Sequence, residues 1–148
     1  MNIINKILVL LFAVLLNANA AFSAEKWDMA GAYGASNFHS ANATEFAKSV
    51  SDKSGGKLTI VTHPGGSLYK GGEIFRAVRT GQTQIGERFM SALGKEDPLL
   101  EIDSQPFLAS SYGDAMKLYK ASKPEIVKGL DAKGLIFLYA VPWPAQGL

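Results

Sequence analysis

Apolar and polar positions along this chain follow two periods, one typical of strands and the other of helices. Short runs of alternating or β-branched residues at 27–33, 57–63 and 84–87 predict strands. Between them, apolar residues at 40–54 and 72–80 recur with the spacing of a helix that buries one face. Strands alternating with helices indicate an α/β domain with a largely parallel sheet flanked by helices.

The segment 40–54 has the clearest helical pattern. Its predicted buried face consists of Ala43, Phe46, Ala47 and Val50. We expect Ser40 or Asn42 to cap the start of this helix. Gly55 and Gly56 are expected to end it, because glycine adopts the left-handed conformation after a helix at little cost.

The second half of the chain has a weaker pattern. Ser111 and Asp114 resemble a capping box that opens a helix ending near residue 121, and Pro124 suits the first turn of another short helix ending before Gly134. The continuous apolar run 135–141 predicts a strand buried on both faces. Buried segments are also predicted around Leu99, Leu100, Ile102, Phe107 and Leu108.

The N-terminus has the order of a secretory signal peptide. Lys6 precedes ten uninterrupted apolar residues at 7–16, and small residues follow at Ala18 and Ala20. A membrane anchor is the alternative, but it needs about 20 apolar residues to cross the bilayer. We therefore expect residues 1–20 to be a signal peptide cleaved after Ala20, with cleavage after Ser23 as an alternative, and the mature protein to lie outside the cytoplasmic membrane.

Composition and charge exclude several classes of function. The 148 residues include 15 Lys and Arg against 13 Asp and Glu, and this balance gives no basic footprint for nucleic acid. The chain has no cysteine, which excludes a disulfide framework, a thiolate zinc site and a cysteine nucleophile. Two histidines, His39 and His63, are too few for a multi-histidine metal site. No cofactor is predicted.

Two candidate motifs are better explained without a ligand. The glycine-rich stretch 65–72 lies between a strand and a helix, but it lacks the spacing of a Walker loop or a dinucleotide site. We expect an ordered turn there. Asp97, Glu101 and Asp103 miss the EF-hand spacing, so we expect them to be solvated.

A few residues stay open between binding and structural roles. Glu87 and Arg88 end a predicted strand, where α/β folds bind ligands, but a surface ion pair is an equal alternative. Trp143, between two prolines, is either a hinge-packing residue or a stacking wall for a ligand. His39 and His63 are interpreted as surface or loop histidines. The sequence shows no catalytic constellation.

Four motifs occur together in one order. They are His63–Tyr69 (HPGGSLY), Arg76–Gln82 (RAVRTGQ) leading into Ile85–Glu87 (IGE), Asp103–Leu108 (DSQPFL) and Val141–Leu148 (VPWPAQGL). With the signal peptide, they closely resemble the extracytoplasmic solute receptors of tripartite ATP-independent periplasmic (TRAP) transporters. The resemblance covers essentially all of residues 25–148.

This resemblance implies a two-lobed, hinge-closing α/β binding protein rather than an enzyme. Such a receptor captures a small organic acid, usually a carboxylate, and delivers it to the membrane permease subunits. Family members are roughly twice this length, so residues 21–148 are expected to be an incomplete first lobe that ends near the crossover to the second lobe.

The resemblance also implies which residues line the ligand. Tyr33 and the segment from Asn37 to His39 match a stretch that lines the pocket, Glu87 matches a pocket acid of the sialic-acid-binding members, and Trp143 lies where the crossover reaches the cleft. The arginine that clamps the ligand carboxylate falls beyond Leu148. A second, less uniform arginine falls near Gln146, where this chain has no arginine.

Two other functions remain as alternatives. One is an exported enzyme that uses Glu87 with His63 or His39 as an acid–base pair. The other is an adaptor that docks on a membrane partner without a ligand.

Overall fold

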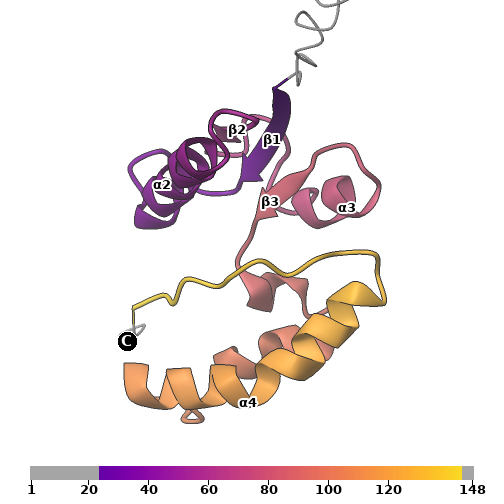
Figure 1. Cartoon of the computed structure of the whole chain (residues 1–148). Coiled ribbons are helices and arrows are strands. Elements are labelled where there is room, and N and C mark those ends of the chain that lie inside the picture. The colour runs from indigo at the N-terminus through magenta and orange to yellow at the C-terminus, as the bar shows by residue number, and fades with distance from the viewer. Residues whose placement is uncertain (1–23, 145–148) are drawn as a thin grey trace, which may run out of the picture.

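The computed structural model describes residues 24–144, which begin with a three-stranded parallel sheet (Figure 1). The central strand β1 (Glu25–Gly31) pairs with β2 (Leu58–His63) on one side and with β3 (Ile85–Glu87) on the other. The order β2-β1-β3 requires a crossover in each connection, and a helix supplies each of them. The predicted parallel sheet is confirmed, with β1 two residues earlier than the expected 27–33.

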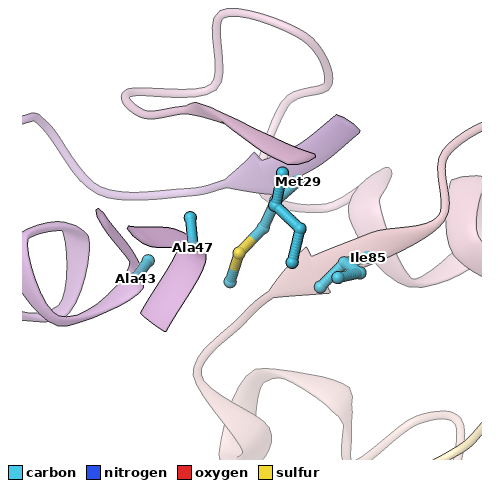
Figure 2. Packing of buried hydrophobic residues seen from close by; sticks show 5 residues of the cluster. Met29, Ala43, Ala47 and Ile85 are labelled. Carbon is cyan, nitrogen blue, oxygen red and sulfur yellow. The ribbon is translucent and has the colours of Figure 1, made fainter. Parts of the chain in front are cut away.

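The helix α2 (Phe38–Lys53) covers one face of this sheet and forms a core with it. Met29 of β1 and Ile85 of β3 lie opposite each other in the ladder and pack with Ala43 and Ala47 of α2 (Figure 2). Their burial stabilises the fold by about 25 cal/mol for each Å² of apolar surface removed from water. The apolar face predicted from helical spacing is therefore confirmed.

The short helix α3 (Ile74–Arg79) packs against β3. Its Ile74 is only 1% exposed, and Phe75 and Ala77 are also buried. Gly81, at φ +71°, follows the helix in the left-handed conformation that glycine adopts without strain. The helix predicted at 72–80 is thus present with shorter bounds.

Gly86 in β3 has no side chain, and α3 occupies the space where a side chain would lie. A Cβ at this position would lie 2.5 Å from Ile74 Cγ2 and 2.9 Å from Val78 Cγ2. Both methyl groups belong to β-branched side chains with a stiff first torsion, so they cannot turn away freely. We expect Gly86→Ala to lower the free energy of unfolding by about 1–3 kcal/mol, the usual cost of overpacking. Urea denaturation measures the difference.

The matched control for this prediction is Gly72→Ala, because a Cβ at Gly72 would meet nothing within 4 Å. Neither Gly72 nor Gly86 has a positive φ, so alanine strains neither backbone. Equal denaturation midpoints for the two variants would contradict the prediction.

A second layer follows β3 and consists of helical segments (Figure 1). It contains the 3₁₀ helices η1 (Met90–Leu93) and η2 (Pro98–Ser104) and the long helix α4 (Tyr112–Asp131). Ser111 Oγ accepts a hydrogen bond from the Asp114 N–H (3.1 Å) and donates one to the Asp114 carboxylate (2.7 Å), so the start predicted from this pair is confirmed. Within residues 24–144 no helix has the length and apolarity needed to cross a membrane.

The predicted break at Pro124 is wrong, since α4 continues through it as one helix. Proline lacks the N–H that would bond to the carbonyl four residues earlier, which makes it costly inside a helix. Here Ser122 and Ile126, on either side of Pro124, are buried, and α4 packs against η2. Ser122 Oγ also donates to the Leu118 carbonyl oxygen (2.9 Å). Tertiary packing therefore outweighs the local penalty.

The prediction of a buried strand at 135–141 is also wrong. This segment forms no strand, and Ile136 is 84% exposed. A strand forms only where a neighbouring strand supplies ladder hydrogen bonds, and the segment instead runs between the sheet and α4 (Figure 1). Apolar composition alone does not provide that pairing.

The buried segments expected around residues 99–108 are present only in part. Leu100 is buried, as predicted. Phe107 is completely exposed and Leu108 half-exposed, so for these two the prediction is wrong. Phe107 has φ +64°, the left-handed backbone of a turn, and this turn directs its ring into solvent.

Candidate functional site

The candidate site lies where β1 and β3 end and α2 begins. Tyr33 follows β1 by two residues, Glu87 is the last residue of β3, and His39 lies in the first turn of α2. Loops at the carboxyl ends of parallel strands are where α/β folds bind ligands. Three residues predicted to contact a ligand therefore share one edge of the sheet.

Asn37 starts α2 as its N-cap, which corrects the expected cap at Ser40 or Asn42. Its Oδ1 accepts a hydrogen bond from the His39 N–H (2.9 Å). Ser40 Oγ instead donates to the Tyr33 carbonyl oxygen (2.9 Å), tying the loop after β1 to the helix. The order Ser36-Asn37 before the apolar Phe38 contains this capping signal, because asparagine is among the strongest N-cap residues.

Trp143 joins the site through four ring contacts. Its ring centroid lies 4.2 Å from that of His39 and 5.1 Å from that of Tyr33. The Phe38 and Phe89 rings lie 5.4 and 6.1 Å away, both edge to face. Such edge-to-face pairs are favourable because ring edges are positive and ring faces negative. Trp143, distant in sequence, is thus brought against two of the predicted residues.

His39 is 4% exposed, so its interpretation as a surface or loop histidine is wrong. Aromatic rings explain the burial, since Phe38 lies 4.0 Å and Trp143 4.2 Å from the imidazole, centroid to centroid. Burial lowers the pKa of His39 below its usual 6.5, because removal from water disfavours the charged form. The imidazole is therefore neutral at pH 7.

Glu87 is a half-buried acid at the end of β3. Burial raises the pKa of Glu87 above its usual 4.5, and a hydrogen bond from the Ala32 N–H and the positive charge of Arg88 act in the opposite direction. Burial also raises the pKa of Tyr33, whose phenol is influenced by both Arg88 and Glu87. The side chains of Glu87, Arg88 and Tyr33 therefore influence one another electrostatically.

Three buried side-chain atoms in residues 24–144 have no hydrogen-bond partner: His39 Nε2, Glu87 Oε2 and Arg88 Nε. All three belong to this edge of the sheet. Buried polar atoms are nearly always paired in folded proteins, since an unpaired one costs about 1–3 kcal/mol. Their gathering at one place distinguishes this edge from the rest of the described molecule.

Arg88, which the sequence left open between ligand binding and a surface ion pair with Glu87, belongs to this site, because its side chain acts on both Glu87 and Tyr33. A Cβ added at Gly71 would lie 3.2 Å from an Arg88 guanidinium nitrogen, so the glycine lets the side chain pass close to the backbone. The Gly-Gly pair before α3 was a signal for such an approach.

Tyr139 also reaches the site, from the segment after α4. Its hydroxyl donates to Asn42 Oδ1 of α2 (3.0 Å), and its ring lies 5.2 Å from that of Phe46. Burial and the negative charge of Glu87 raise its pKa. Tyr139 and Trp143 together hold the segment 135–144 against α2.

His63 has a separate environment. Its Nε2 lies 2.8 Å from Asp28 Oδ1 on the neighbouring strand, so it pairs with Asp28 rather than with Glu87. The loop that follows is the ordered turn predicted for 65–72. The Gly65 N–H donates to the Tyr33 carbonyl oxygen (2.7 Å) and the Gly66 N–H to the Gly31 carbonyl oxygen (2.9 Å), which occupies both amides.

The acidic residues at 97–103 have local partners. Asp97 caps η2 through the Leu99 N–H (3.0 Å), and Asp103 accepts from Ser91 Oγ (2.8 Å). Within residues 24–144 there is no group of three or more His, Asp or Glu side chains that could hold a metal ion.

Comparison with known proteins identifies the family. The model of the bacterial extracellular solute-binding proteins, family 7, matches residues 29–144. This chain belongs to that family. Its match includes α2, all of β2 and β3, and the residues Tyr33, Asn37, His39, Glu87 and Trp143.

Solved structures similar to the chain include two receptors for the same ligand. A marine metagenome TRAP solute-binding protein specific for pyroglutamate is 56% identical, with a TM-score of 0.81 over 82% of this chain and 40% of its own. DctP6 of Bordetella pertussis, an extracytoplasmic receptor binding pyroglutamic acid, is 50% identical, with a TM-score of 0.79 over 80% of this chain and 40% of its own. The chain thus spans about 40% of their length.

A curated relative is the C4-dicarboxylate-binding protein DctB of Bacillus subtilis (strain 168). It is 32% identical over 97 residues, which are 60% of this chain and 28% of that protein. The recognised family and the parallel sheet flanked by helices agree with the expectation from the sequence motifs. Family and neighbours are solute-binding receptors.

Proposed function

We propose that this protein is the solute-binding component of a TRAP-type transporter and that its ligand is pyroglutamate. The observation that carries the proposal is that three solved receptors at 56%, 50% and 43% identity all bind pyroglutamate. Because the chain spans about 40% of each of them, the proposal concerns the complete gene product.

The site supports this proposal through its chemistry. Pyroglutamate has a flat five-membered ring, an amide edge and a carboxylate. Tyr33 and Trp143 offer aromatic faces for the ring, while Glu87 and His39 carry unpaired polar atoms. Asn37 caps the start of α2 through the His39 N–H. We propose all five as ligand-lining residues.

We further propose that an arginine beyond Leu148 clamps the ligand carboxylate, since a guanidinium can bind both oxygens. Hinge closure between two lobes would then enclose the ligand, which passes unchanged to the permease subunits in the membrane. Residues 1–20, which lie outside the described residues, are proposed as a signal peptide cleaved after Ala20 that directs the protein to the periplasm.

Calorimetric titration of the complete gene product with pyroglutamate tests the function. The protein is first unfolded in guanidinium and refolded, so that any co-purified ligand is removed. We expect saturable 1:1 binding and no chemical change in the recovered ligand by NMR. Succinate and glucuronate are matched comparators that share only the carboxylate.

Two outcomes would count against this proposal in different ways. Saturable binding of succinate but not of pyroglutamate would support the receptor function and overturn pyroglutamate as the ligand. Absence of binding to every carboxylate by a cooperatively folded protein would overturn the receptor function itself.

A further inference from the structure

Glu87 presents a buried acceptor to the site. Its Oε2 has no hydrogen-bond partner, although the Ala32 N–H donates to the same carboxyl group. The backbone of Glu87 is fixed by its pairing opposite Gly31 in the sheet. The carboxyl group is therefore held in place by the fold, with one oxygen left for another donor.

The three unpaired atoms of the site differ in what they can bind. Arg88 Nε carries a hydrogen and only donates, so it can bind an acceptor. His39 Nε2 donates or accepts according to its tautomer. An ionised carboxylate only accepts. Of the three atoms, Glu87 Oε2 is therefore the one that always requires a hydrogen-bond donor, independent of the tautomer of His39.

The surroundings define the kind of donor. Rings of Tyr33, His39 and Trp143 pack within 4.2–6.0 Å of one another, centroid to centroid, beside this acid. Such walls suit a compact apolar ring and offer few groups for a ligand with many hydroxyls. A single N–H in an otherwise apolar ring meets both conditions, and a lactam has that group.

We propose that Glu87 determines specificity by accepting the ring N–H of the ligand, so that the site selects lactam carboxylates over rings with oxygen or methylene at that position. The inference rests on the proposed function and deepens it. A site built to bond an N–H discriminates against an analogue that lacks one, because its buried acceptor then stays unpaired.

Two isosteres of pyroglutamate test this assignment directly. In 5-oxotetrahydrofuran-2-carboxylate, a ring oxygen replaces the N–H. Its lone pairs would then face the Glu87 carboxylate, which also only accepts. In 3-oxocyclopentane-1-carboxylate, a methylene replaces the N–H and removes the donor without adding an acceptor. We expect the wild-type protein to bind pyroglutamate about 10- to 100-fold more tightly than either, the range for a hydrogen bond to a charged group.

The variant Glu87→Gln keeps the size of the side chain and adds a donor. Its amide can turn to donate to the ring oxygen, so we expect the preference for lactam over lactone to fall to about threefold or less. Glu87→Asp keeps the charge but retracts the acceptor, and we expect it to lose affinity for the lactam while still discriminating against the lactone. Thermal unfolding without ligand checks that each variant is folded.

A pH series adds a readout that a structural role for Glu87 would not change. The ionised form accepts the N–H, and burial raises the pKa of Glu87, so affinity is expected to fall as pH decreases through that raised pKa and to be flat above it. The positive charge of Arg88 also acts on this carboxyl group, and Glu87 in turn acts on the phenols of Tyr33 and Tyr139, whose raised pKa values keep them neutral over this range. Protonation of His39 at low pH would have the opposite effect, because a positive imidazole would raise the affinity for an anionic ligand.

The failures of the two proposals are distinguishable. If pyroglutamate binds but the lactone and the carbocycle bind as tightly, the role of Glu87 is overturned and the receptor function stands. Unchanged lactam preference in Glu87→Gln would overturn it as well. If no carboxylate binds, the proposed function itself fails.

Discussion

Replacing Trp143 by alanine is expected to weaken pyroglutamate binding by about 100-fold, which corresponds to about 2.7 kcal/mol. Aromatic anchors at the centre of a binding site commonly cost 2 kcal/mol or more when truncated. Trp143 contacts four rings, including His39 and Tyr33, so its removal would take away a ligand wall and also loosen the residues behind it. Calorimetric titration of the complete protein measures the loss.

Trp143→Phe is the matched control, since it keeps a ring against His39 while removing the indole. We expect it to retain most of the affinity, because a phenyl ring can still make edge and face contacts. Thermal unfolding in the absence of ligand separates loss of the wall from loss of folding. Wild-type affinity in Trp143→Ala would show that Trp143 only packs the segment 135–144 and does not line the ligand.

Local chemistry explains why much of the sheet-and-helix layer could be predicted from the sequence. Ala43 and Ala47 recur at helical spacing, and the structure places both in the core. Ser111 caps the start of α4 through the Asp114 N–H, and the two residues lie within four consecutive positions. Interactions of this kind depend on neighbours in the chain, so the sequence displays them directly.

The failures share a dependence on distant partners. The run 135–141 has the composition of a strand, but pairing depends on a neighbouring strand that composition does not reveal. Pro124 breaks helices in isolation, yet here the packing of Ser122 and Ile126 keeps α4 continuous. His39 is buried by Trp143, which lies at the other end of the described chain.

The candidate site was predictable only in outline. Glu87 and Arg88 were marked by their position at the end of a strand, and Trp143 by its place between two prolines. Tyr33, Asn37 and His39 came from resemblance to a receptor family. The structure adds what neither source contains, namely that the unpaired atoms of His39, Glu87 and Arg88 gather at one edge. Burial of individual atoms depends on the three-dimensional arrangement and has no counterpart in a local pattern.

The other large expected effect concerns folding, because Ile74 holds α3 against the sheet. The side chain is 1% exposed and lies over Gly86 of β3. Ile74→Ala is expected to lower the free energy of unfolding by about 2–5 kcal/mol, from lost burial and from the cavity that remains. Arg76→Ala, at an exposed position of the same helix, is the control and is expected to change stability by less than about 0.5 kcal/mol.

Combining Ile74→Ala with Gly86→Ala tests whether these residues act through the contact itself. The new Cβ at position 86 would no longer meet the Ile74 methyl at 2.5 Å, and only Val78 Cγ2 at 2.9 Å would remain in its way. The double variant should therefore be more stable than the sum of the two losses predicts, by about 1 kcal/mol, as is usual for residues in direct contact. If the losses in the free energy of unfolding, measured by urea denaturation, are strictly additive, α3 must shift away from β3 in each single variant. The rest of α3, rather than this contact, would then stabilise this part of the fold.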